Sequence, residues 1–189
     1  MDSLQLSMDK NSKENELAME CLELARDSIL INMRFLDVAL LKLPIKAEPA
    51  LKGVAANGSN FCYDSGYILK CQKEEPNLVA RSYLHSILHC IFNHSFNYDS
   101  YRTHLWDLAC DIAIENMIME LELDAVSLKD DDRRRARLRG LRKNVHDLTA
   151  QKIYRHFLIY DLAEDDDREY TELFTRDLHI YFEIGRAHV

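Results

Sequence analysis

Two histidines four residues apart are the part of the sequence best suited to chemistry. His85 and His89 lie in the segment 83–93, whose apolar residues recur at helical spacing. On a helix the two imidazoles are about 40° apart, at the edge of an apolar face. This arrangement lets two histidines bind one zinc ion from a single helical turn. The same spacing also occurs in histidines that only pack against a core, which is the alternative interpretation.

A zinc site needs a third ligand, and the next apolar segment offers one. Residues 104–121 are apolar almost all round, as expected of a helix that passes through a core. Asp111 lies among its apolar residues, and Glu115 follows one turn later. A buried carboxylate is costly unless it is paired, protonated or bound to a metal. Two histidines and one carboxylate, with a fourth position open, form a known catalytic zinc set. His94 is an alternative third ligand if the helix ends or bends near Asn93.

The rest of the sequence predicts the elements that would position these residues. Helical spacing of apolar residues predicts helices over 16–43 (one helix, or two with a break), 77–93, 104–121 and 148–162. The only β signal is a pair of short strands on either side of the turn Asn57-Gly58. Residues 1–15 are polar and aperiodic, which predicts a loose leader. These patterns indicate a mainly helical α+β fold with a small sheet or hairpin.

Two charged stretches lie between and after the predicted helices. Asp130–Asp132 is followed by a basic run from Arg133 to Lys143, which could contact a nucleic acid or an acidic partner. The alternative is an exposed helix or loop whose acidic and basic residues neutralise each other. The acidic run 164–167 predicts a solvated loop.

Composition narrows the class of protein. The 189 residues are 47% hydrophobic and 30% charged, which is typical of one globular domain and excludes disorder of the whole chain. A net charge of −8 argues against a nucleic-acid footprint over the whole surface. No apolar stretch approaches the roughly 20 residues of a membrane-spanning helix, and the N-terminus lacks a signal-peptide pattern. The five scattered cysteines form no CxxC pair, so we expect no disulfide framework and a cytoplasmic location.

The last six residues, 184–189, can be encoded by the opening bases of a common sequencing adapter. We therefore expect a non-native tail and a natural chain that continues beyond Glu183. The alternative is a genuine polar C-terminus.

The order of these features resembles the zincin-like metallopeptidase domain family that, in bacterial proteins, precedes a von Willebrand factor A-like domain. The family signature is a His-Glu-x-x-His helix extended by a further histidine, then a short loop, then a Trp-Asn-x-Ala-x-Asp helix that ends near an Asn. The corresponding residues here are His85, His89 and His94, followed by Trp106, Ala109, Asp111 and Asn116. Segments 56–63, 148–154 and 174–179 resemble further parts of the family.

The resemblance implies a zincin-like fold over residues 16–183, followed by a von Willebrand factor A-like domain. It implies that His85 and His89 bind zinc, with Asp111 or His94 completing the site. We prefer Asp111, because His94 requires a break in the helix. It also implies a protein or peptide as the molecule bound, with an AAA-type ATPase as a possible partner and no membrane association.

One departure from the family pattern bears on activity. The glutamate after the first histidine takes a proton from zinc-bound water and returns one to the leaving amine, but Ser86 stands at that position. A serine hydroxyl is no general base near neutral pH unless another group activates it, and losing a base typically costs about 10² to 10⁴ in rate. Glu115 could substitute through a water molecule if its helix packs closely enough.

We therefore predict a degenerate zinc-metallopeptidase-like domain, a pseudoenzyme that binds metal and acts as a binding or regulatory module. The alternatives are an active zinc-dependent hydrolase that uses a different base, and a protein without metal. For Asp177 and His179 we expect packing at a domain junction rather than chemistry.

Overall fold

The computed structural model describes residues 3–94 and 103–179. The expected loop over 95–102 and the expected non-native tail over 184–189 lie outside the described residues. The helices are α1 (Ser3–Asn32), α2 (Asp37–Lys42), α3 (Ser65–Glu74), α4 (Asn77–Ile91), α5 (Thr103–Glu120), α6 (Asp131–Arg142), α7 (Ala150–Tyr160) and α8 (Glu164–Phe174), with short 3-10 helices η1 (Arg34–Leu36) and η3 (Asp124–Val126). The strands are β1 (Ile45–Ala47), β2 (Val54–Ala56) and β3 (Phe61–Tyr63).

The three strands form one small sheet in the order β1-β3-β2. β2 and β3 are the predicted antiparallel pair, and their connection is held by Asn57, whose Oδ1 accepts hydrogen bonds from two following backbone amides. Gly58 has φ 78°, a conformation that glycine adopts without strain. β1 pairs in parallel with β3 and was not predicted. The mainly helical α+β fold is confirmed.

Two predictions about the polar segments are wrong. Residues 3–15 are not a loose leader but belong to α1. They contain no glycine or proline, and Asn15 accepts a hydrogen bond from Ser65 Oγ on α3 at 2.6 Å. The acidic run 164–167 is not a loop but the first turn of α8, because carboxylates are favourable at the N-terminal end of a helix dipole.

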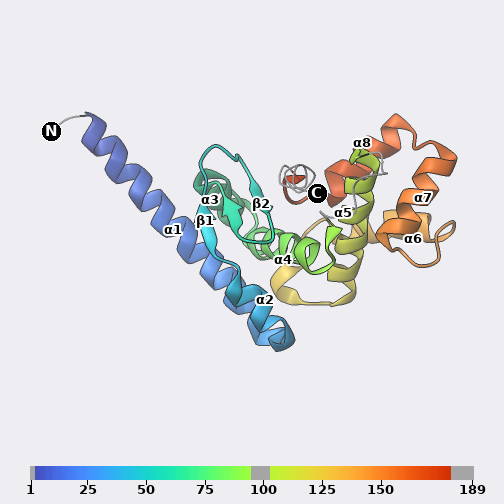
Figure 1. The fold of residues 1–189 in the computed structure, drawn as a ribbon, viewed down its shortest axis with the longest axis horizontal. Coiled ribbons are helices and arrows are strands. Elements are labelled where there is room, and N and C mark those ends of the chain that lie inside the picture. The colour runs from blue at the N-terminus through green and yellow to red at the C-terminus, as the bar shows by residue number, and fades with distance from the viewer. Residues whose placement is uncertain (1–2, 95–102, 180–189) are drawn as a thin grey trace.

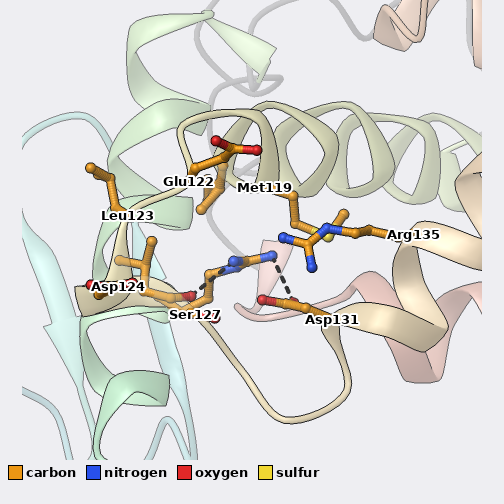
Figure 2. A pocket seen from close by; sticks show the side chains of 10 residues that line it. Met119, Glu122, Leu123, Asp124, Ser127, Asp131 and Arg135 are labelled. Atoms are coloured by element: carbon orange, nitrogen blue, oxygen red, sulfur yellow. Dashed lines mark hydrogen bonds and ion pairs between the residues drawn. The ribbon is translucent and has the colours of Figure 1, made fainter.

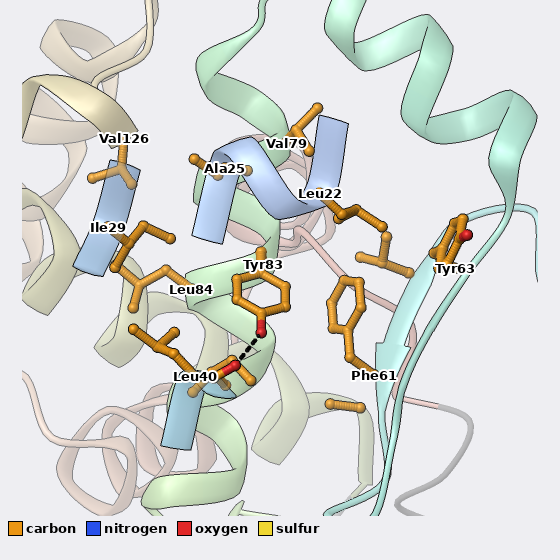
Figure 3. Close-up of a cluster of buried hydrophobic side chains, with 14 of the residues drawn as sticks. Leu22, Ala25, Ile29, Leu40, Phe61, Tyr63, Val79, Tyr83, Leu84 and Val126 are labelled. Carbon is orange, nitrogen blue, oxygen red and sulfur yellow. Dashed lines mark hydrogen bonds between the residues drawn. The ribbon is translucent and has the colours of Figure 1, made fainter. Parts of the chain in front are cut away.

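The hydrophobic side chains form two main cores. The first joins α1, α3, α4 and the sheet. In Figure 3, Leu22, Ala25 and Ile29 of α1 face Tyr83 and Leu84 of α4, with Phe61 and Tyr63 of the sheet beside them. The second core joins α5, α6, α7 and α8. Figure 1 shows the same division, with α1 along one end of the molecule and α5 to α8 gathered at the other.

Helix α5 contributes to both cores. Ile114 and Ile118 pack in the first, whereas Trp106 and Ile112 pack in the second. This double role explains why its sequence is apolar almost all round. Among the described residues, no helix combines the length and the apolar character needed to cross a lipid bilayer.

Candidate metal centre

Helix α4 directs two imidazoles to one point between the two cores. The run from Val79 to His89 is buried. His85 Nε2 and His89 Nε2 lie 3.0 Å apart, as the helical spacing of the two residues predicts. Both side chains are almost completely shielded from solvent.

Helix α5 directs a carboxylate at the same point. Asp111 Oδ1 lies 3.3 Å from His85 Nε2 and 3.2 Å from His89 Nε2. Asp111 is buried, as predicted from its place among apolar residues.

The segment after α8 brings two further groups that we had expected to pack at a domain junction. Asp177 Oδ1 lies 3.7 Å from His85 Nε2 and 3.9 Å from His89 Nε2. His179 Nε2 lies 3.0 Å from Asp111 Oδ1 and 3.3 Å from Asp177 Oδ1. The structure therefore places both side chains beside His85, His89 and Asp111, which the sequence did not predict, and the junction itself stays a prediction. Their spacing of two, which aligns side chains on an extended segment, was the available signal.

The spacing of these atoms suits a metal ion. Ligand atoms about 2.0–2.1 Å from a tetrahedral zinc ion lie about 3.3–3.4 Å from one another. The contacts of His85 and His89 with each other and with both carboxylates span 3.0 to 3.9 Å. One ligand atom each from His85, His89, Asp111 and Asp177 lies within 4.8 Å of the other three, and all four residues are buried. We call these four residues the His/Asp cluster; it could hold a metal ion.

The charges of the cluster also favour a bound cation. Burial alone would raise the pKa of Asp111 and Asp177. The neighbouring imidazoles, chiefly His179 for Asp111 and His89 for Asp177, lower the pKa of both well below the usual range. Two ionised carboxylates are therefore buried together. Asp177 Oδ1 lies within ion-pair distance of His179, His85 and His89, so positive charge is stabilised at this position.

The Nδ1 atoms of His85 and His89, here called the outer nitrogens, have different partners. His85 Nδ1 lies 3.0 Å from Glu115 Oε1, whereas His89 Nδ1 lies 3.3 Å from His94 Nδ1. Burial and the neighbouring His89 lower the pKa of His94 to about 3, so His94 is neutral and can accept a hydrogen bond. Such partners fix the tautomer that presents Nε2 to a metal.

The position of His94 follows from the break in the helix that we thought necessary for it to be a ligand. α4 ends at Ile91, and Asn93 has φ 59° in the left-handed region. The break, however, turns His94 toward the far side of the His89 ring. His94 therefore lies outside the His/Asp cluster, and Asp111 lies in it.

Glu115 is fixed behind His85 by a buried arginine. Arg81 Nη2 and Nε donate to the Glu115 carboxylate at 2.8 and 3.0 Å. Burial would raise the pKa of Glu115, but Arg81 and His85 lower it to about 2. Both carboxylate oxygens are engaged on the side of His85 away from the cluster, a geometry that does not favour Glu115 as a substitute base.

Arg81 connects the buried network to the surface. Its Nη1 donates to the Val126 carbonyl at 2.9 Å, and its Nη2 lies 3.5 Å from Asp131 Oδ1. Figure 2 shows the surface pocket that Arg81 lines, with Asp131 and Arg135 on one side and Asp124 and Ser127 on the other. Glu115 is thus held indirectly by η3 and α6 as well as by α4.

Ser86 has no partner in this arrangement. Its side chain is fully buried, and its Oγ makes no hydrogen bond within the described part of the chain. No described contact activates the hydroxyl as a base.

The basic run forms α6 and is paired with acidic residues. Arg133 Nη1 lies 2.9 Å from Glu172 Oε1, and Arg137 contacts Asp166 and Glu169 of α8. These pairs favour mutual neutralisation over a nucleic-acid surface. The helix is not exposed throughout, because Asp131 and Arg134 are buried.

Comparison with known proteins agrees with this geometry. Residues 19–177 match the model of a family described as "Putative metallopeptidase domain". Since the match covers most of the chain, the chain belongs to this family. No curated protein and no solved structure matches it.

Replacing Arg81 by methionine tests the buried network. Arg81→Met leaves Glu115 buried without its main cationic partner, so we expect a loss of about 3–5 kcal/mol in the free energy of unfolding, measured by urea denaturation. Arg133→Met, whose ion pairs are exposed, should leave the midpoint almost unchanged. Equal effects of the two substitutions would contradict the role assigned to Arg81.

Proposed function

We propose that this chain is a zinc-binding, metallopeptidase-like domain that has lost ordinary peptidase catalysis and serves as a binding or regulatory module. The observation that carries the proposal is the convergence of two imidazole nitrogens and two carboxylate oxygens at the spacing of metal ligands. The partner of the module, including an AAA-type ATPase, stays a prediction from the family resemblance.

His85, His89 and Asp111 would hold the metal from helices, and Asp177 would supply the fourth ligand. Two nitrogens and two oxygens suit zinc, whereas calcium and magnesium prefer oxygen ligands throughout. Neutralising two buried carboxylates gives a divalent cation a further advantage.

The chemistry of such a site depends on a base that this chain lacks. A bound zinc ion polarises a carbonyl group and lowers the pKa of a coordinated water. A carboxylate normally receives the proton of that water, but Ser86 stands in its place. This substitution supports a binding role over a catalytic one.

An active hydrolase with a different base is the second candidate, and the position of His179 favours it. The His179 imidazole contacts both Asp111 and Asp177, beside the position of a metal ligand. Burial disfavours its charged form, yet Asp111 and Asp177 raise the pKa of His179 well above its usual value, so it would donate a proton until a bound cation neutralised the two carboxylates. Turnover by the wild-type chain would support this candidate.

Metal content is the direct test of the site. We expect about one zinc ion per wild-type chain by elemental mass spectrometry. His89→Ala and Asp111→Ala should lose most of this zinc, because each removes one ligand. His146→Ala, which changes an exposed histidine outside the cluster, should retain it. Equal zinc in the wild type and in His89→Ala would overturn the proposed site.

Zinc binding should also release protons. Burial disfavours protonation of His85, yet the hydrogen bonds that it donates to Asp111 and Glu115 raise its pKa to about 9 in the metal-free chain. Zinc must displace the proton on Nε2, and by neutralising Asp111 and Asp177 it removes the charges that raise the pKa of His179. We therefore expect at least one proton released per zinc at pH 7 and an affinity that rises toward pH 9. Calorimetric titration in two buffers of different ionisation enthalpy measures this release. A heat independent of the buffer would contradict it.

Restoring the base tests the loss of catalysis. Ser86→Glu should raise cleavage of an unstructured protein substrate by about 10² to 10⁴ over the wild type. Ser86→Gln has a similar side-chain volume without a carboxylate, so it should stay inactive and serves as the control for packing. If the wild type matches Ser86→Glu, the catalytic candidate replaces the binding module.

A further inference from the structure

We propose that residues Asp177–His179, here called the closing segment, are a displaceable cover of the metal centre. In the described conformation the segment fills the fourth ligand position through Asp177, and its release opens that position to an external ligand. The inference rests on the metal site proposed above and concerns its regulation.

The closing segment lies against the edge of the sheet. β2 is an edge strand in the order β1-β3-β2, and Leu178 N donates to the Val54 carbonyl at 2.8 Å. Edge strands present unpaired backbone groups to extended chains. The segment therefore occupies a place where another extended peptide could pair.

The side chains of the segment meet two different surroundings. Asp177 belongs to the His/Asp cluster and His179 contacts Asp111 within it. Leu178 points elsewhere and packs on Gly53, where an added Cβ would lie 3.1 Å from Leu178 Cδ1 and 3.3 Å from Cγ. The space at Gly53 that Leu178 occupies is here called the Leu178 seat. A larger residue at position 53 would fill it.

The described residues hold the segment mainly through its two polar side chains. Asp177 lies 3.7 Å from His85 Nε2, and His179 Nε2 lies 3.0 Å from Asp111 Oδ1. Apart from these ion pairs, the described contacts are one backbone hydrogen bond and the packing of Leu178, which is 36% exposed. We therefore expect that a ligand that competes with these side chains can displace the segment.

The other ligands are held far more firmly. His85 and His89 lie on α4 and Asp111 lies on α5, both packed in the hydrophobic cores. Of the four ligands, Asp177 alone comes from a segment outside the helices α1 to α8. Without Asp177, three protein ligands and an open position remain, which is the arrangement of a zinc site that accepts an external ligand.

The two residues just before the closing segment are held in place by contacts with α5. Thr175 Oγ1 donates to Asp111 Oδ2 at 2.7 Å. Arg176 is largely buried, lies 3.8 Å from Glu115 Oε2 and donates to the Thr175 carbonyl at 2.9 Å. Movement therefore begins after Arg176, and the chain before it stays in place.

The test uses the full chain loaded with cobalt, whose visible absorption reports its ligands, and acetohydroxamate as the external ligand. Gly53→Val places methyl groups in the Leu178 seat without changing a ligand. Gly140→Val is the matched control, because a Cβ added at Gly140 meets nothing within 4 Å. Leu178→Ala removes the same contact without adding volume, so it serves if Gly53→Val folds poorly.

A closed segment lowers apparent affinity by the fraction of open chains. We expect Gly53→Val and Leu178→Ala to change the cobalt spectrum at about tenfold lower acetohydroxamate than the wild type, with Gly140→Val unchanged. Equal responses of the wild type and both seat variants would overturn the proposal while leaving the metal site intact. A wild-type chain that takes up no cobalt and no zinc would overturn both proposals.

Discussion

Ionised carboxylates buried between α4 and α5 are the constraint on which the rest of the structure depends. Burying such charges is expensive unless each finds a counter-charge. Glu115 has Arg81 at 2.8 Å, with Arg134 and Arg176 within 3.9 Å. Asp111 instead faces imidazoles and a second carboxylate. The polar layer is therefore divided, with guanidinium groups gathered behind His85 and carboxylates gathered in front of it. In the metal-free chain the counter-charges of the front half are His85 and His179, whose pKa values the carboxylates raise, and a metal ion could take their place.

The two hydrophobic cores explain how this polar layer is held. α5 gives Ile114 to one core and Ile112 to the other, which leaves Asp111 and Glu115 on the side that faces α4. The cluster thus lies on a seam between two packed halves. Because α4 packs in the first core and α5 packs in both, the positions of the ligand atoms on α4 and α5 follow from apolar packing at a distance from the site.

Periodicity was enough to predict the helices that carry His85, His89 and Asp111, because a repeat of 3.6 places side chains on a known face. The same reasoning missed β1, whose three residues are too short to show a pattern and depend on pairing with β3. It also missed α3, although Asp64 caps that helix by accepting from Tyr67 N at 2.7 Å. Asp177 could not be assigned to the metal centre from the sequence. It lies more than sixty residues after Asp111, and no local pattern indicates which part of the fold its side chain contacts. The pairing of Arg81 with Glu115 likewise depends on how α4 packs against α5, so the sequence of neither helix alone predicts it.

The partners of the two outer nitrogens make the paired histidines chemically unequal. His85 rests on a carboxylate, Glu115, and His89 rests on a neutral ring, His94. An imidazole that donates to a carboxylate gains electron density and becomes a stronger donor. If a metal binds, His85 would then be the stronger donor of the two histidines. The same side chain, repeated after one helical turn, thus stands in two electronically different surroundings.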